Sequence, residues 1–389
     1  MSLLVTVTGR DHPGVTAALM DVLSAHGATV DDVEQVVVHG RLLLGVVIAG
    51  DGNGDAVQAD LRAAADALAM EVEFTPLDDP AEPPGTGARH HVVVLGAPLP
   101  PAALAGLTRR LASCGANIER VVRLSSWPAQ SFELLVSGGE TIRLRHELAA
   151  EAVLQQVDVA VEPASLYRRG RRLVVMDVDS TLVRGEVIEM LAAEAGCEPE
   201  IARVTAAAMA GELDFEASLR ARVALLEGLP WEAVERVRQA VRLTPGARTL
   251  VRTLKRLGFA VAIVSGGFTA VTDDLRDSLG LDHALANELE VVGGRLTGRV
   301  VGPVVDRAGK AAALLRFAAL EGLAPAQTVA IGDGANDLDM LAAAGLGIAF
   351  NAKPIVREAA DAALSVPFLD AVLCLLGVPR EEVDAADRA

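Results

Sequence analysis

Two aspartates follow an apolar run near the middle of the chain. Residues 173–176 are Leu-Val-Val-Met, and Asp177 and Asp179 stand among the next three positions. A short apolar run of this kind is typical of a strand buried on both faces of a parallel sheet, and ligand sites in such sheets lie at the carboxyl ends of the strands. The sequence therefore places two carboxylates on the same face, where an α/β protein carries out its chemistry. The alternative is an Asp-rich turn in which Ser180 or Thr181 caps the next helix.

Three later segments add polar groups at the ends of other predicted elements. Each segment is weak alone, but together they would bring a hydroxyl, bare backbone amides, a lysine and more carboxylates to the same edge of one sheet. The groups are Ser265 and Gly266 after a strand at 261–264, Lys310 before an apolar helix at 311–319, and Asp333, Asn336 and Asp337 after a strand at 328–331.

This ordered set resembles the haloacid dehalogenase-like phosphohydrolases, which implies an α/β fold with a Rossmann-like parallel sheet. The resemblance implies that Asp177 attacks phosphorus and forms an aspartyl-phosphate. A phosphate dianion repels this carboxylate, so a cation must lie between them, and Mg²⁺ suits because it prefers hard oxygen ligands. By resemblance, the side chains of Asp177 and Asp333 and the backbone carbonyl of Asp179 hold the metal.

The other matched residues surround the phosphoryl group. By resemblance, Asn336 and Asp337 shape the outer shell of the metal, and Asn336 also contacts the substrate. Lys310 supplies a second positive charge, and Ser265 and Gly266 donate hydrogen bonds to the phosphoryl oxygens as charge develops. The alternatives are that Lys310 is a solvated surface lysine and that the Ser-Gly-Gly segment is only a tight turn.

Charge counting assigns the role of Asp179. Asp177, Asp333, Asp337 and a phosphate dianion carry about −5, against about +3 from Mg²⁺ and Lys310, so like-charge repulsion is expected to raise the pKa of Asp179. A protonated Asp179 can protonate the leaving alkoxide. As a carboxylate it can then take a proton from the water that hydrolyses the acyl-phosphate.

A helical insertion at about 186–245 is expected to form a cap over the sheet, with helices at 186–195, 200–210, 215–226 and 231–240. The spacing of four residues in this insertion narrows the resemblance to the phosphoserine phosphatases: Glu186, Met209, Phe215 and Arg222. Arg222 then grips the carboxylate of phosphoserine and Glu186 pairs with its ammonium, while Met209 and Phe215 exclude water. The alternatives are salt bridges on a helix surface for the charged pair and core packing for the apolar pair.

The expected function is Mg²⁺-dependent hydrolysis of O-phospho-L-serine to L-serine and phosphate, the last step of serine biosynthesis. One alternative keeps the aspartyl-phosphate but acts as a phosphotransferase, or as a phosphatase on another small phosphate ester. Another is an amino-acid sensor with a silent phosphatase fold. The presence of Asp177, Asp179, Lys310 and Asp333 together argues against silence.

Composition is typical of a soluble cytoplasmic enzyme. The chain has 389 residues and a net charge of −17, which argues against binding nucleic acid or an anionic membrane. The sequence shows no secretion signal and no apolar stretch near the ~20 residues of a membrane span. Its three cysteines and seven histidines fit no metal or disulfide spacing, so a zinc enzyme is not expected.

The chain before residue 170 repeats itself. Residues 111–118 resemble residues 23–30 at an offset of 88, and at that offset the strand at 5–8 falls on 93–96. Each copy predicts the order β-α-β-β-α-β, the ferredoxin-like pattern. Prolines and glycines between the copies mark a linker. We therefore expect three domains: 1–79, 89–165 and 170–389.

The two copies resemble ACT-type regulatory domains, which commonly bind amino acids at paired domain interfaces. This implies an amino-acid effector and a homodimer or higher homo-oligomer; we expect the effector to be L-serine because the catalytic half resembles a serine-producing enzyme. In the first copy the ligand loop includes Asp11, which could take an amino group, and Gly14, which allows close backbone approach. The second copy has prolines at 98, 100 and 101, which remove amide donors. The alternative is that both copies only form a dimer interface.

Overall fold

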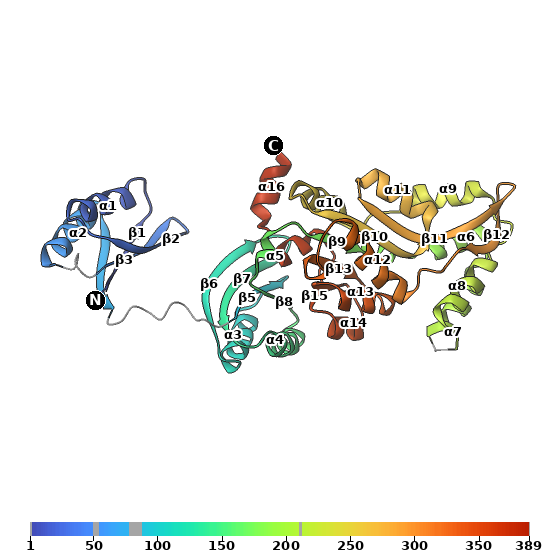
Figure 1. Ribbon diagram of the computed structural model, residues 1–389, viewed down its shortest axis with the longest axis horizontal. Helices are drawn as coiled ribbons and strands as arrows, with labels where there is room; N and C mark the ends of the chain where they lie inside the picture. Colours follow the sequence, from blue (N-terminus) through green and yellow to red (C-terminus); the bar gives the residue numbers. More distant parts are fainter. Residues whose placement is uncertain (1, 50–53, 78–87, 210–211, 389) are drawn as a thin grey trace. The chain divides into compact units, whose positions relative to one another are not determined.

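The computed structural model describes residues 2–49, 54–77, 88–209 and 212–388. The chain divides into two compact units, Met1–Thr86 and Gly87–Ala389 (Figure 1).

The first unit is an antiparallel sheet with strand order β2-β3-β1-β4 and with α1 and α2 on one face. Leu19 of α1 and Leu61 of α2 pack against Val5 of β1 in its core. Alternate β1 residues are buried because successive side chains of a strand point to opposite faces. The order is the predicted one: β1 Ser2–Arg10, α1 Val15–Ala25, β2 Val30–Val38, β3 Arg41–Ile48, α2 Asp55–Ala67 and β4 Met70–Leu77.

The second unit begins with another copy of the same pattern, and its helices α3 and α4 pack on one face of the sheet. Its elements are β5 Arg89–Gly96, α3 Pro101–Ser113, β6 Ala116–Ser125, β7 Gln130–Gly138, α4 Thr141–Gln155 and β8 Asp158–Pro163.

The first strands of the two copies differ from the predicted register. Val5 faces the helices of the first copy, and Val92 faces those of the second, 87 positions later. The predicted match of 5–8 with 93–96 is therefore wrong by one residue. A slip of one residue moves a side chain to the opposite face of a sheet, so Val93 faces away from α3 and α4.

The second copy and residues 170–389 share one sheet of eleven strands. Ala160 of β8 pairs antiparallel with Ala362 of β15, which gives the order β12-β11-β10-β9-β13-β14-β15-β8-β5-β7-β6. Val93 belongs to the same buried core as the parallel strands. At the junction, buried Arg172 donates to Glu162 at 2.7 Å. The expected regions 89–165 and 170–389 therefore form one compact unit in this structure.

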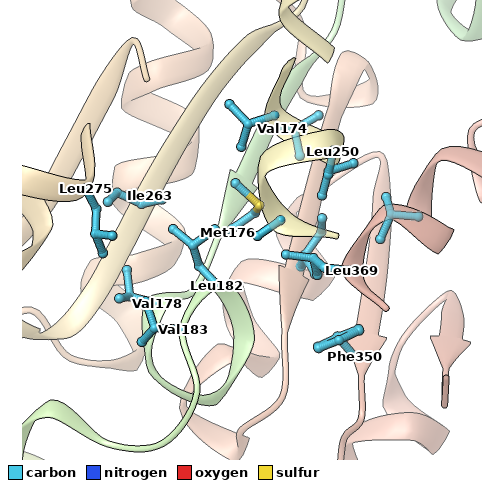
Figure 2. Close-up of a cluster of buried hydrophobic side chains, with 14 of the residues drawn as sticks. Val174, Met176, Val178, Leu182, Val183, Leu250, Ile263, Leu275, Phe350 and Leu369 are labelled. Atoms are coloured by element: carbon cyan, nitrogen blue, oxygen red, sulfur yellow. The ribbon is translucent and has the colours of Figure 1, made fainter. Parts of the chain in front are cut away.

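Strand β9 lies in the middle of the parallel part, between β10 and β13. Its apolar run is buried on both faces, as the sequence predicted. Val174 and Met176 pack in the core that contains Leu250 of α10 (Figure 2). Leu173 and Val175 pack on the other face, against α12 and α13. The elements around this strand, which we call the body, are β9 Leu173–Met176, α10 Ala247–Arg256, β10 Ala260–Phe268, α11 Thr269–Leu279, α12 Arg307–Leu320, β13 Thr328–Gly332, α13 Leu338–Ala343 and β14 Leu346–Phe350.

The predicted insertion is helical, and its helices lie at the end of the second unit away from β5–β8 (Figure 1). The hairpin β11–β12 extends beside it, and a bridge joins Pro230 to Arg295. This contact between the hairpin and the helical insertion was not predicted from the sequence. The elements are α6 Val187–Ala195, α7 Glu198–Met209, α8 Phe215–Ala224, α9 Trp231–Ala240, β11 His283–Val292 and β12 Arg295–Val301.

Short elements complete the described chain: α5 Leu166–Arg169, α14 Pro354–Ala359, β15 Ala362–Leu364, α15 Val372–Leu375 and α16 Arg380–Arg388. Among the described residues, no helix combines the length and apolar character needed to cross a membrane.

Candidate active site

Asp177 is held at the carboxyl end of β9. Its N–H donates to the carbonyl of Ile331 on β13 at 2.8 Å, which continues the strand pairing by one residue. The side chain is buried, and its Oδ1 accepts a hydrogen bond from Lys310 Nζ at 2.6 Å. Burial and the nearby charge of Asp337 raise the pKa of Asp177 well above its ordinary value. The carboxylate is therefore fixed in direction and short of positive charge.

Asp179 lies in the turn that follows β9, where Ser180 adopts a φ of 58°. Its Oδ1 accepts from the N–H of Val187, the first residue of α6, at 2.8 Å. Its Oδ2 accepts from the Ser265 hydroxyl at 3.1 Å. Burial raises the pKa of Asp179. A raised pKa was expected from like-charge repulsion, but its main cause is the loss of solvation on burial.

Ser265 and the two following glycines form the turn that leaves β10. Ser265 is fully buried, and its Oγ accepts from the Gly267 N–H at 2.8 Å. A Cβ at Gly266 would lie 2.9 Å from Cζ of Phe215, and one at Gly267 would lie 2.9 Å from Oδ2 of Asp179. Glycine is favoured at both positions because a side chain there would have to displace Phe215 of the cap or the carboxyl of Asp179.

Asn287 supports this turn and was not predicted. It is buried in β11, its amide donates to the Gly266 carbonyl at 2.8 Å, and its Oδ1 accepts from the Val305 N–H at 2.8 Å. A buried polar side chain needs such partners. The only sequence signal was an Asn within an otherwise strand-like run, which gave no reason to assign it to the site.

Lys310 is fully buried in the first turns of α12 and is not a surface lysine. Asp306 caps this helix by accepting from the Gly309 N–H at 2.7 Å. The ammonium donates to Asp177 at 2.6 Å and to Asp337 at 2.7 Å. Burial alone would lower the pKa of Lys310, but the two carboxylates outweigh it and raise that pKa. Lys310 is therefore a permanent cation behind Asp177.

The loop after β13 brings the remaining carboxylates to the same edge. Asp333 Oδ1 accepts from the buried Thr181 hydroxyl at 2.8 Å, and burial is the main reason that its pKa is raised to about 6. Asp337 Oδ2 accepts from the Gly334 N–H at 3.0 Å. A Cβ at Gly332 would lie 2.5 Å from Cγ of Asp337, so that carboxylate fits only against glycine.

A divalent cation fits this group of side chains. Asp177, Asp333 and Asp337 each offer an oxygen atom, and these atoms lie within 4.8 Å of one another. One ammonium cannot neutralise three carboxylates, and the charge of Asp337 adds to burial in raising the pKa values of Asp177 and Asp333. Both oxygens of Asp337 already have donors, Lys310 and the Gly334 amide. This favours a place for Asp337 outside the direct ligands of the cation.

The carboxylates of Asp177 and Asp333 line a cleft of about 560 Å³ between the body and the cap. Phe215, Glu186 and Arg222 line it, as predicted, and Asn336 lines the opposite side. Met209 is the last residue of α7, and its side chain lies outside the described part of the chain. The lining residues that were not predicted to face the substrate include Thr205, Leu213, Asn351 and Lys353.

Two charged groups from the cap side face these carboxylates. Glu186 accepts a hydrogen bond from the Ser180 hydroxyl at 3.2 Å. Burial, followed by the charges of Asp179 and Asp333, raises the pKa of Glu186 to about 7. Arg222 is half-buried and donates only a long bond of 3.4 Å to the Ser218 carbonyl within the described residues. Its other guanidinium N–H groups make no hydrogen bond within the described residues and are available to a ligand in the cleft that Arg222 lines.

The predicted regulatory residues lie in the first unit. The Asp11 N–H donates to the Gly40 carbonyl at 2.9 Å, and the Asp11 side chain is exposed. Gly14 precedes α1 with a φ of 100°, and a Cβ there would meet no atom within 4 Å. Glycine is thus favoured by backbone conformation, and space remains above it.

Comparison with known proteins identifies the regions of the chain. The haloacid dehalogenase-like hydrolase family matches residues 174–342, and two ACT domain families match residues 1–75 and 88–162. A phosphoserine phosphatase of Streptomyces coelicolor is 58% identical over 390 residues, covering 99% of this chain and 94% of the relative. The chain belongs to the phosphoserine phosphatase family. The predicted family, enzyme class and α/β fold with two ACT domains are thereby confirmed.

Two solved structures from the phosphoserine phosphatase family represent states of a reaction. A phospho-aspartyl intermediate analogue of phosphoserine phosphatase has a TM-score of 0.50 and 46% identity, covering 52% of this chain and 98% of that chain. A substrate-bound phosphoserine phosphatase complex has a TM-score of 0.51 and 45% identity, covering 53% and 98% respectively.

Proposed function

We propose that this protein hydrolyses O-phospho-L-serine to L-serine and phosphate through an aspartyl-phosphate on Asp177, the last step of serine biosynthesis in the cytoplasm. The observation that carries the proposal is the position of Asp177. It is buried at the end of the central strand, fixed by Lys310, and opens into a cleft whose other wall bears Arg222 and Glu186. The phospho-aspartyl analogue in a related enzyme supports the same chemistry.

The metal proposed for this site is Mg²⁺, held by Asp177, Asp333 and the backbone carbonyl of Asp179. When bound, it supplies positive charge to the phosphoryl oxygens and reduces the repulsion between substrate and nucleophile. Only oxygen donors are available among these residues, which is the set that Mg²⁺ prefers.

The first step breaks the phosphorus–oxygen bond to serine. A carboxylate oxygen of Asp177 attacks phosphorus, and the protonated carboxyl of Asp179 gives its proton to the leaving serine oxygen. Burial raises the pKa of that carboxyl, which favours its protonated form, and the Ser265 and Val187 hydrogen bonds hold its direction. Lys310 and the Gly266 amide stabilise the negative charge on the transferring group.

The second step restores the enzyme. Asp179, now a carboxylate, takes a proton from a water molecule that attacks the phosphorus of the acyl-phosphate. The phosphorus–oxygen bond to Asp177 breaks, which releases phosphate and the free carboxylate. The same residue therefore acts first as acid and then as base.

Substrate choice is proposed to come from the cap. The guanidinium of Arg222 pairs with the serine carboxylate, and Glu186 pairs with the ammonium. Phe215, which packs over Gly266, covers the phosphoryl group and excludes water.

The ACT domains are proposed to bind an amino acid, L-serine, at the loop that contains Asp11 and Gly14. A homodimer or higher homo-oligomer is proposed as well. The supporting observation is β2, an edge strand whose residues are all exposed and include Val33, Val36 and Val37. An exposed apolar edge strand is a surface on which another chain can pair.

Phosphate release from a panel of phosphoesters tests the function. We expect phosphoserine to give the highest kcat/KM and an added alcohol to leave the yield of free phosphate unchanged. A faster reaction with another small ester, or transfer of phosphate to the alcohol, would instead support the alternative substrate or the phosphotransferase.

A further inference from the structure

Lysine is rare in this chain, and one lysine has no role in the mechanism above. Only three of the 35 cationic Lys and Arg residues are lysines. Lys310 is the buried cation behind Asp177, and Lys255 is paired with both oxygens of Asp282 at 2.6 and 2.7 Å. The third is Lys353. Lysine carries a compact point charge on a flexible stem, whereas arginine is suited to planar, bidentate contacts.

Lys353 lies on the rim of the cleft because the backbone directs it there. Strand β14 ends at Phe350, and Asn351 turns the chain with a φ of 45° while its N–H donates to Leu364 at 2.8 Å. Pro354 then begins α14, and the residue before a proline is restricted to an extended conformation. Lys353 has a φ of −63° and a ψ of 155°, so its position is fixed from both sides.

The lining of the cleft is otherwise acidic. Four of its lining residues are carboxylates: Asp177, Asp179, Glu186 and Asp333. The only cations among the lining residues are Arg222, on the cap, and Lys353, on the body. Lys353 is exposed, and no carboxylate among the described residues lies within the 4.0 Å of an ion pair with it. A charge at the mouth of a cleft acts chiefly on the encounter with a charged ligand.

We propose that Lys353 is a substrate-recognition residue that attracts the dianionic phosphoryl group of a phosphate monoester into this cleft. The proposal rests on the proposed function and adds Lys353 to Arg222 and Lys310, the two cations already assigned to the substrate. Arg222 serves the carboxylate of phosphoserine, so it acts on that substrate only. Lys353 lies on the same side as the phosphoryl site and acts on every phosphate monoester.

Two substrates and four proteins test this division. We measure kcat and KM for phosphoserine and for an aryl phosphate, which lacks the carboxylate and the ammonium, at low and high salt. The proteins are the unmodified enzyme, Lys353→Gln, Lys353→Arg and Lys255→Gln. The side chain of Lys353 makes no capping hydrogen bond to α14, so Lys353→Gln leaves the helix start intact. Lys255→Gln is the control for loss of a lysine charge outside the cleft.

We expect Lys353→Gln to lower kcat/KM about fivefold on both substrates at low salt, the effect of one exposed charge. The loss should appear in KM, leave kcat unchanged and shrink at high salt because screening removes it. Lys353→Arg should restore most of kcat/KM, and Lys255→Gln should match the unmodified enzyme.

Unchanged kcat/KM on both substrates would overturn the proposal. So would a loss confined to phosphoserine, which would assign Lys353 to the carboxylate or ammonium end, or a loss in kcat with a lower Tm, which would assign it a structural role. If the unmodified enzyme hydrolyses the aryl phosphate but not phosphoserine, the proposed function fails, while the effect of Lys353→Gln on the aryl phosphate still tests this inference.

Discussion

The carboxyl group of Asp179 lies 2.8 Å from the backbone N–H of Val187, the first residue of the cap helix α6. Its second oxygen accepts from Ser265 on the body. The proposed acid–base group is therefore held by both layers that enclose the cleft. Its direction depends on where the cap begins as well as on the end of β10.

Replacing Asp179 by Asn tests its role as acid and base. The amide keeps the size of the side chain and an oxygen that can accept from Val187, but it cannot give or take a proton. We expect kcat for phosphoserine to fall by about 10²–10⁴-fold, the usual contribution of such a group, with Tm almost unchanged. Asp339→Asn, at an exposed ion pair on α13, is the control. Normal turnover by the Asp179 variant would remove Asp179 from the proton transfers.

Arg222 is expected to separate recognition from chemistry. Arg222→Ala should lower kcat/KM for phosphoserine by about 10- to 150-fold, because a hydrogen bond to a charged group contributes about 1.5–3 kcal/mol. Hydrolysis of an aryl phosphate should change little. Arg220→Ala removes an arginine from the same helix, where it pairs with Glu216 at the surface, and is the matched control. Equal losses on both substrates would show that Arg222 supports the cap instead.

Glu186 gives an expected pH dependence. Its pKa is raised to about 7, mainly by burial, so the carboxyl is neutral below that pH and ionised above it. Only the ionised form pairs with the substrate ammonium, so KM for phosphoserine should fall as pH rises through about 7. Glu186→Gln should abolish this change, and the aryl phosphate should not show it. A KM for phosphoserine that is independent of pH in the unmodified enzyme would contradict the assignment.

Removing the first ACT domain tests regulation by serine. A chain of residues 88–389 retains the second compact unit, including the eleven-stranded sheet. A shorter chain beginning near residue 164 would lose Val93 from the shared core and Glu162, the partner of Arg172, so it is the wrong comparison. L-serine is titrated at fixed phosphoserine against the whole chain and the chain of 88–389. We expect the shorter protein to keep only the weaker inhibition due to product binding. Equal inhibition of both would leave the first domain without a regulatory role.

The local parts of the site could be predicted because their signals are local. A run of four apolar residues requires burial on both faces, and this identified β9 and the position of Asp177. The helical insertion was visible from apolar periodicity broken by glycine, and α9 has the predicted bounds, 231–240. Such features depend on neighbours in the sequence, so composition and spacing are sufficient to find them.

The missed features depend on pairing between distant segments. The eleven-stranded sheet is completed by one pair, Ala160 with Ala362, and neither residue has a distinctive sequence context. Asn287 supports the Ser265 turn across strands, and Lys353 reaches the cleft through a turn at Asn351. The predicted alignment of the first strands of the two copies was wrong by one residue. The sequence similarity lies mainly in the helices, whereas the alignment of the strands depends on which face of each strand is buried.

The most direct test of the account is detection of the covalent intermediate. The enzyme is mixed with phosphoserine labelled in the phosphoryl group, quenched in acid within the first turnover, and digested for peptide mapping. We expect the label on the peptide that contains Asp177, its release by hydroxylamine, and its absence from Asp177→Asn, which should be folded but inactive. Label on another residue, or normal turnover by Asp177→Asn, would contradict the proposed mechanism.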